Sequence, residues 1–154
     1  MLRQSLQISN ALAVISADGF EPIAIVGDFT VPASLVATDV IEMCILPAGY
    51  VPLSAKLCAD DIDTGAALTM DVGIITGVAG KFDNARTCGN EAIAGTTIGQ
   101  TGGLVIDNKP EYSMLLPAVV DRGVGVRIAT GAAGLVVGSR LRLTIHARPQ
   151  LNGV

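Results

Sequence analysis

The sequence predicts an all-β fold: an antiparallel β-sandwich, jelly-roll-like, with an N-terminal arm. Apolar and polar side chains alternate along short segments, as they do in strands that have one buried face. Turn signals recur between these segments, and the chain holds 18 Gly and 7 Pro. The alternation is clearest over residues 140–148, where the apolar face carries Leu141, Leu143, Ile145 and Ala147 and the polar face carries Arg140, Arg142, Thr144, His146 and Arg148.

The first eighteen residues carry few turn or core signals. We expect residues 1–18 to form the arm and residues 19–154 to form a single sandwich domain. Four strands should open this domain, bounded by Pro32, by the turn Pro47-Ala48-Gly49 and by an acidic turn. They are expected over residues 22–31, 39–46, 51–59 and 67–76.

Residues 77–103 break this rhythm, because they hold Gly, Thr and Asn without clear periodicity. A short helix is expected near residues 88–94, and a segment of this length is usually functional or disordered. Strands should return over residues 111–116, 123–130 and 135–148. Their apolar faces should be buried, and these faces carry Val124, Val126, Ile128, Leu141, Leu143 and Ile145.

The composition favours a protein that assembles with partners. Half of the 154 residues are hydrophobic, only 16% are charged, and the formal net charge is −4. Such a chain leaves a poorly solvated surface for a monomer, so we expect a homo-oligomer. General nucleic-acid binding is not expected, because it needs clustered Lys and Arg in excess.

No uncharged stretch reaches the length of about 18 residues that a membrane-spanning helix needs. The apolar run over residues 11–15 follows Gln7, Ser9 and Asn10, so a secretory signal is only weakly indicated. Cys44, Cys58 and Cys88 lack the spacing of a disulfide framework and fit reduced thiols in a cytoplasmic setting. A bridge between neighbouring strands stays open as an alternative.

Two glycine-containing segments resemble nucleotide-binding loops but lack their required residues. Residues 77–82 lack the first Gly of a phosphate loop, and Phe82 stands where Ser or Thr must hold magnesium. Residues 123–128 end in Ile128 instead of the third glycine of a dinucleotide fingerprint. Gly123 and Gly125 more often mark close backbone approach within a strand.

The sequence offers no convergent set of metal ligands or catalytic groups. His146 is the single histidine, and no Cys pair has metal-ligand spacing. Asp60, Asp61 and Asp63 could offer oxygen atoms to calcium, but such turns usually bind backbone N–H groups. No cofactor, metal or enzymatic activity is therefore expected. Asp28 and Asp71 are expected to face solvent or pair with arginine.

Three segments together resemble the small virion proteins of tailed bacteriophages. They are Asp39-Val40-Ile41-Glu42 leading into Leu46-Pro47-Ala48-Gly49-Tyr50, then Asp60-Asp61-Ile62-Asp63, then Leu68-Thr69-Met70-Asp71-Val72-Gly73-Ile74. The similarity covers roughly residues 35–147, and its motifs are structural turns.

The resemblance implies a capsid decoration (cement) protein that binds and stabilises the lattice of the major capsid protein. It also implies a trimer on the capsid surface of the virion, assembled in the host cytoplasm, with no membrane or nucleic-acid partner. A head–tail connector or tail component is the alternative within virions. A glycan-binding sandwich is an alternative of another class, and it would have only Tyr50 and Tyr112 for stacking on sugars.

Two features should make contacts outside the sandwich. The arm, through Leu2, Leu6 and Ile8, could add along the sheet edge of a neighbour. The basic stripe of Arg140, Arg142 and Arg148 could meet carboxylates on a neighbouring subunit or on the capsid, or could simply be solvated, or could touch nucleic acid.

Overall fold

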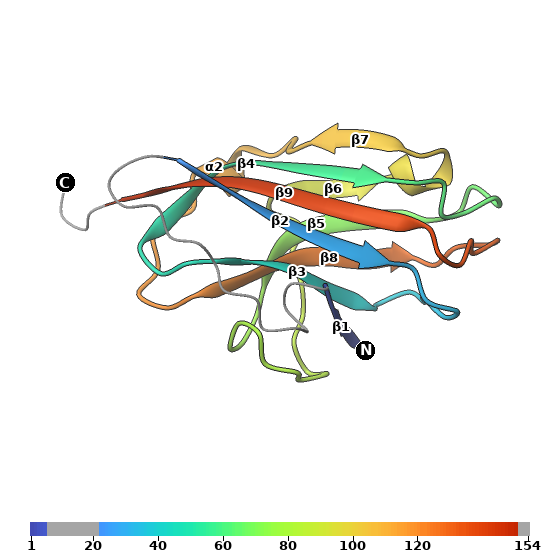
Figure 1. Ribbon diagram of the computed structural model, residues 1–154, viewed down its shortest axis with the longest axis horizontal. Coiled ribbons are helices and arrows are strands. Elements are labelled where there is room, and N and C mark those ends of the chain that lie inside the picture. The colour runs from blue at the N-terminus through green and yellow to red at the C-terminus, as the bar shows by residue number, and fades with distance from the viewer. Residues whose placement is uncertain (6–21, 151–154) are drawn as a thin grey trace.

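The computed structural model describes residues 1–5 and 22–150. Two sheets pack face to face, so the predicted all-β sandwich is confirmed (Figure 1). The five-stranded sheet has the order β1-β3-β8-β5-β6, which are Leu2–Gln4, Val40–Leu46, Arg122–Thr130, Thr69–Ile75 and Ile93–Thr96. The four-stranded sheet has the order β2-β9-β4-β7, which are Ile23–Thr30, Arg140–Pro149, Tyr50–Ala59 and Gly103–Ile106.

Neighbouring strands are antiparallel except for β1, which pairs in parallel with β3. The core lies between the inner faces of the two sheets and consists mainly of Val, Ile, Leu and Met side chains. The six side chains predicted to be buried have no exposed surface. The period-2 pattern therefore identified the inner faces of β8 and β9 correctly.

The sandwich is closed along one side by close contact between β2 and β3. A Cβ atom at Gly27 would lie 2.1 Å from the carbonyl oxygen of Met43, so only glycine fits where these two strands meet. The sulfur of Cys44 lies 3.8 Å from the carbonyl oxygen of Ile25 on the same side. These contacts join two strands that belong to different sheets.

Two local predictions were wrong. The strand expected over residues 111–116 is the helix α2, Pro110–Ser113, because Pro110 suits a first helical turn and Tyr112 is buried there instead of pairing in a sheet. The helix expected near residues 88–94 is extended: Cys88 bridges to Ile75, and β6 begins at Ile93. Backbone pairing with β5 overrides the local preference there.

Three short strands and one bound escaped the sequence pattern. The strands β1, β6 and β7 span three or four residues each, which is too short for an alternation to be visible in the sequence. The 3₁₀ turn η1, Ile98–Gln100, is equally short. The last strand starts at Arg140 instead of residue 135, because Gly138 takes a left-handed φ of 87° and ends the preceding loop.

The predicted arm is described only at its beginning. Residues 2–4 form β1 on the edge of the five-stranded sheet, and Leu2 is 2% exposed in a cluster with Val40, Ile75 and Cys88 of the same chain. Leu6 and Ile8 lie outside the described residues. No helix among the described residues is long and apolar enough to cross a membrane.

Candidate interaction surface

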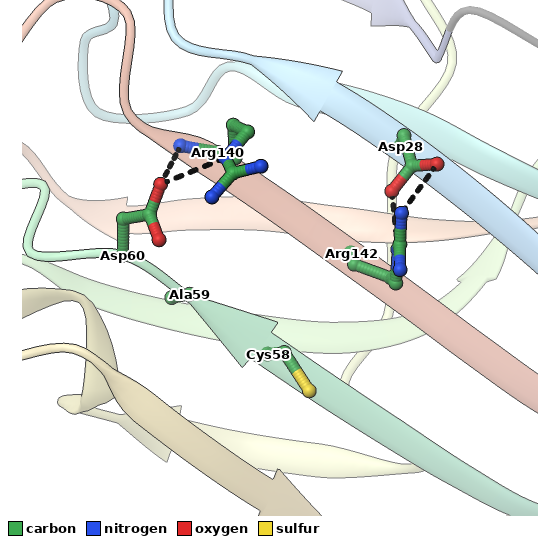
Figure 2. Close-up of a pocket in the computed structure, with 6 residues that line it drawn as sticks. All are labelled: Asp28, Cys58, Ala59, Asp60, Arg140 and Arg142. Atoms are coloured by element: carbon green, nitrogen blue, oxygen red, sulfur yellow. Dashed lines mark hydrogen bonds and ion pairs between the residues drawn. The ribbon is translucent and has the colours of Figure 1, made fainter.

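The outer face of the four-stranded sheet carries a shallow groove of about 250 Å³. Strands β2, β9 and β4 supply its walls, and the residues that line it are Asp28, Cys58, Ala59, Asp60, Arg140 and Arg142 (Figure 2). Alternation along β9 places both arginines on this face, while Leu141 and Leu143 point into the core. Two of the three arginines of the predicted basic stripe, Arg140 and Arg142, therefore line this groove at one end of β9.

Each arginine of the groove already has a carboxylate partner. Arg142 forms two bonds with Asp28, Nε to Oδ1 at 2.5 Å and Nη2 to Oδ2 at 3.2 Å, and this partner raises the pKa of Arg142 (Figure 2). Asp60 accepts the backbone N–H of Arg140 at 2.9 Å and its Nε at 3.2 Å. These bonds hold the pKa of Asp60 below its ordinary value. The groove is thus charged but internally neutralised.

The remaining polar residues of this face lie farther along β9. Arg148 is exposed and lies six positions, or about 20 Å of strand, beyond Arg142. Its side chain makes no hydrogen bond or ion pair with the described part of the chain, although its backbone pairs with Val51 of β4. His146 Nδ1 lies 3.1 Å from the hydroxyl oxygen of Ser54. The structure therefore brings Arg140 and Arg142 together, whereas the Arg148 side chain stands apart from them and has no charged partner among the described residues.

The three cysteines carry free thiols in two different environments. Cys44 and Cys88 are buried, and burial raises the pKa of both, to about 12 for Cys88, so they behave as small apolar side chains. Cys58 is half-buried, and it lines the groove (Figure 2). No cluster of three or more potential metal ligands occurs within residues 1–5 and 22–150.

The acidic turn is held in place by the carboxylate of Asp63. Asp63 is fully buried and accepts four backbone N–H groups, from Gly65, Ala67, Leu68 and Gly134, at 2.7–2.9 Å. Burial raises its pKa, but the four donors outweigh burial and hold the pKa well below its ordinary value. The expectation that this turn binds backbone N–H groups is confirmed for Asp63.

The outer face of the five-stranded sheet is built differently, because residues 77–91 cover it. Arg86 reaches back to β3 and forms a bidentate ion pair with Glu42, at 2.9 Å and 2.7 Å, with both side chains at most 2% exposed. A Cβ atom at Gly123 would lie 2.3 Å from Glu42 Oε1, so glycine leaves room for this pair. Residues 77–91, which belong to the segment without clear periodicity, thus cover the outer face of the five-stranded sheet.

Around this buried pair the carboxylate and main chain of Glu42 bind three further groups. Gln4 Nε2 and the backbone N–H of Gly80 donate to the carboxylate at 3.3 Å and 3.1 Å, and Ser5 N–H donates to the Glu42 carbonyl at 2.6 Å. On the same face Arg127 pairs with Asp71 through Nε at 3.1 Å. Of the two outcomes expected for Asp28 and Asp71, a solvent-facing side chain or a pair with arginine, the structure shows the arginine pair for both.

An apolar loop over residues 114–120 was missed by the sequence interpretation, which placed part of it in a strand. Its sequence is Met-Leu-Leu-Pro-Ala-Val-Val, and the exposed fractions of Leu116 and Val119 are 77% and 86%. The available signal was an apolar run interrupted by Pro117, which is incompatible with a central strand. By contrast, Tyr50 and Tyr112, the two tyrosines considered for sugar stacking, are buried.

Comparison with known proteins places these surfaces in context. No protein-family model matches the sequence, and no curated protein sequence matches it. A chain of the capsid of Ralstonia phage GP4 is 36% identical, with a TM-score of 0.92 over 99% of this chain and 100% of that chain.

Two further solved structures share the fold. A chain of the cyanophage Pam1 capsid asymmetric unit is 20% identical, with a TM-score of 0.66 over 91% of this chain and 96% of that chain. A chain of the acid-stable capsid of Helicobacter pylori bacteriophage KHP30 is 10% identical, with a TM-score of 0.52 over 82% of this chain and 86% of that chain.

Proposed function

This chain belongs to the bacteriophage virion structural proteins, and we propose that it decorates the capsid lattice. A capsid chain of Ralstonia phage GP4 is related to it over its whole length. In the decorating role this chain binds the major capsid protein from outside and stabilises the shell as a cement protein. The observation that carries the proposal is the full coverage of that capsid chain at 36% identity.

The difference between the two outer faces supports binding through one of them. The five-stranded sheet is covered by its own residues 77–91, which occupy its polar groups. Among residues 1–5 and 22–150 no comparable segment covers the four-stranded sheet, which exposes Val26, Leu104 and Ile106 beside the groove. A mixed face of apolar and charged side chains suits a protein–protein contact. We assign the contact with the lattice or with a neighbouring subunit to this face.

Copy number tests the decorating role. Quantitative gel densitometry of purified virions should give hundreds of copies of this chain per particle, on the scale of the major capsid protein. About a dozen copies or fewer would instead place it in the head–tail connector or the tail, where rings have low stoichiometry.

We propose a homotrimer as the assembling unit, closed by heterologous contacts into a ring. The support is the number of large apolar side chains left exposed in one subunit, which include Val26, Leu104, Ile106 and Val119. Sedimentation at micromolar concentration should show a species about three times the 15.7 kDa chain mass. A single 15.7 kDa species would refute the trimer.

The arm and the stripe are proposed as contact residues of unequal weight. Leu6 and Ile8 should contribute apolar and backbone contacts to a neighbour, so L6S/I8S should attach poorly to shells that lack this protein while β1 stays in place. Among the arginines, R148S should weaken attachment mildly, and more at low salt than at high salt. R140S is the matched control with the smaller effect, because Arg140 already pairs with Asp60.

A further inference from the structure

Strand β7 leaves one edge of the four-stranded sheet open. Among the described strands it pairs with β4 alone, and it lies at the rim of the sandwich (Figure 1). Its outward-facing side chains, Leu104 and Ile106, are 61% and 56% exposed. An open sheet edge is a template for another strand, and proteins usually protect it with Lys, Pro or a bulge. Residues 103–106, Gly-Leu-Val-Ile, contain none of these.

The other three sheet edges formed by the described strands are occupied or irregular. Strand β2 lies against β3, where Gly27 meets the backbone of Met43. The edge of β1 is tied to the covering segment, because the Leu2 N–H donates to Asn84 Oδ1 at 3.2 Å. Strand β6 has a register shift against β5 and a left-handed φ of 61° at Gly95, which interrupt a regular ladder. Of the four described edges, β7 therefore offers the one that is both regular and open.

The register of β7 shows which of its backbone groups point outward. The Asp107 N–H donates to the Ala55 carbonyl of β4 at 2.8 Å, and the antiparallel pairing continues without a shift through β7. Antiparallel strands exchange hydrogen bonds at every second pair, so Val105 bonds toward β4, whereas Leu104 and Ile106 direct their N–H and C=O groups away from it. Outside the β4–β7 ladder, no hydrogen bond in the described part of the chain uses these outward groups.

We propose that β7 pairs with β7 of a second copy of this chain, about a two-fold axis at Val105. In this antiparallel seam Leu104 of each copy lies opposite Ile106 of the other, so that the outward N–H and C=O groups of both residues meet. About four hydrogen bonds then cross the seam. On the exposed face, the Leu104 and Ile106 side chains of both copies form one apolar cluster of cross-strand neighbours. The edge is therefore complementary to itself, as an isologous contact requires.

Neighbouring residues fix the register of this seam. Gly102, on one side of β7, has a left-handed φ of 73°, which a ladder does not accommodate. On the other side, the Asn108 N–H already donates to the Ala92 carbonyl at 3.0 Å. The charges are compatible as well, because each Asp107 lies opposite Gly103 of the other copy and not opposite the second Asp107. The regular and unoccupied part of the edge is thus limited to β7 itself.

The size of the seam decides what it can hold together. Leu104 and Ile106 of each copy cover an area on the order of a few hundred Å². A stable complex buries about 800 Å² on each partner. The seam therefore joins subunits that another interface already holds close to one another. It goes beyond the proposed trimer, whose contacts are heterologous, and beyond the decorating role, so the failure of the seam leaves both of these untouched.

Cysteine cross-linking tests the seam and its register. At the two-fold axis the Cα atoms of the Val105 pair lie about 4.5 Å apart, which a disulfide can span, whereas the Cα atoms of the Leu104 pair lie about 7–8 Å apart. In a C58S background, mild oxidation of V105C should therefore give about tenfold more linked dimer than L104C, although Leu104 is the more exposed side chain. V26C, on the opposite edge strand of the same sheet, is the matched control. A yield from V105C no higher than from L104C or V26C would overturn the proposal.

A proline tests the backbone bonds of the seam without removing the ladder to β4. Ile106 directs its N–H outward, so I106P removes a donor of the seam and keeps the bonds that Val105 and Asp107 form with β4. Added to the V105C/C58S chain, I106P should lower the yield of linked dimer about tenfold, with circular dichroism unchanged. The control I106V keeps the N–H and should lower the yield less than about threefold. The same yield from I106P and I106V would show that backbone pairing does not hold the two copies together.

Discussion

The outer faces of the two sheets differ in whether their ion pairs are buried or exposed to solvent. On the five-stranded sheet, Glu42 of β3 forms a buried pair with Arg86, which belongs to the covering residues 77–91. On the four-stranded sheet, Asp28 and Arg142 form a bidentate pair in solvent. The same chemistry therefore has different consequences: the buried pair fixes the position of a long segment, whereas the exposed pair leaves a surface available to a partner.

The largest expected effect comes from breaking the buried pair. R86A leaves the Glu42 carboxylate buried without its partner and should lower the free energy of unfolding by about 3–5 kcal/mol, measured by urea denaturation. The double variant E42Q/R86M, which has no buried charge at this site, should recover much of the loss. A loss below about 1 kcal/mol for R86A would show that the cover does not depend on this pair.

Strand β9 allows the inner and outer faces to be compared between adjacent residues. Leu143 is fully buried between the sheets, so L143A should cost about 2–5 kcal/mol, because it removes apolar contacts and leaves a cavity. Thermal or urea unfolding checks this value. The result would be contradicted if L143A were no more destabilising than a substitution of Arg142 on the opposite face.

Acid should distinguish two neighbouring aspartates, the buried Asp63 and the exposed Asp60. The folded pKa of Asp63 is depressed, so its stabilisation is present above its unfolded pKa of about 4 and is lost as the pH falls through the folded value. The stability advantage of the wild type over D63N should therefore be full at pH 6–7 and shrink below about pH 4. Unfolding curves across this range test it.

D60N is the control, and it should change the pH profile less, because Asp60 has fewer donors and lies in solvent. Identical profiles of stability against pH for D63N and D60N would contradict the role of Asp63 in holding its loop through backbone N–H groups.

The smallest expected effect is the loss of the exposed pair. R142A should shift the melting temperature by no more than about 1–2 °C, and the shift should diminish as salt is added. Calorimetry at low and high salt measures it. A large shift that salt does not reduce would mean that the groove is part of the stable framework rather than an accessible surface.

Local sequence patterns predicted the features that depend on residues close together in the chain, namely the two faces of a strand and the turns. Alternation along residues 140–148 identified the inner face of β9 and placed Arg140 and Arg142 on its outer face. The turn at residues 47–49 and the acidic turn were also recognised, and Asp63 binds backbone N–H groups as expected. The pairs of Asp28 and Asp71 with arginine were among the predicted outcomes.

The sequence by itself therefore determined an all-β sandwich, the inner faces of its long strands and its main turns, because period-2 alternation and turn chemistry act between close neighbours in the chain. Only the tertiary structure decided that Glu42 meets Arg86 across forty-four residues, that β1 lies on β3, and that the 114–120 loop stays exposed. These outcomes depend on which segments meet in space. A charged residue carries no local sign of its distant partner, and a short apolar run has the same pattern whether or not another segment covers it.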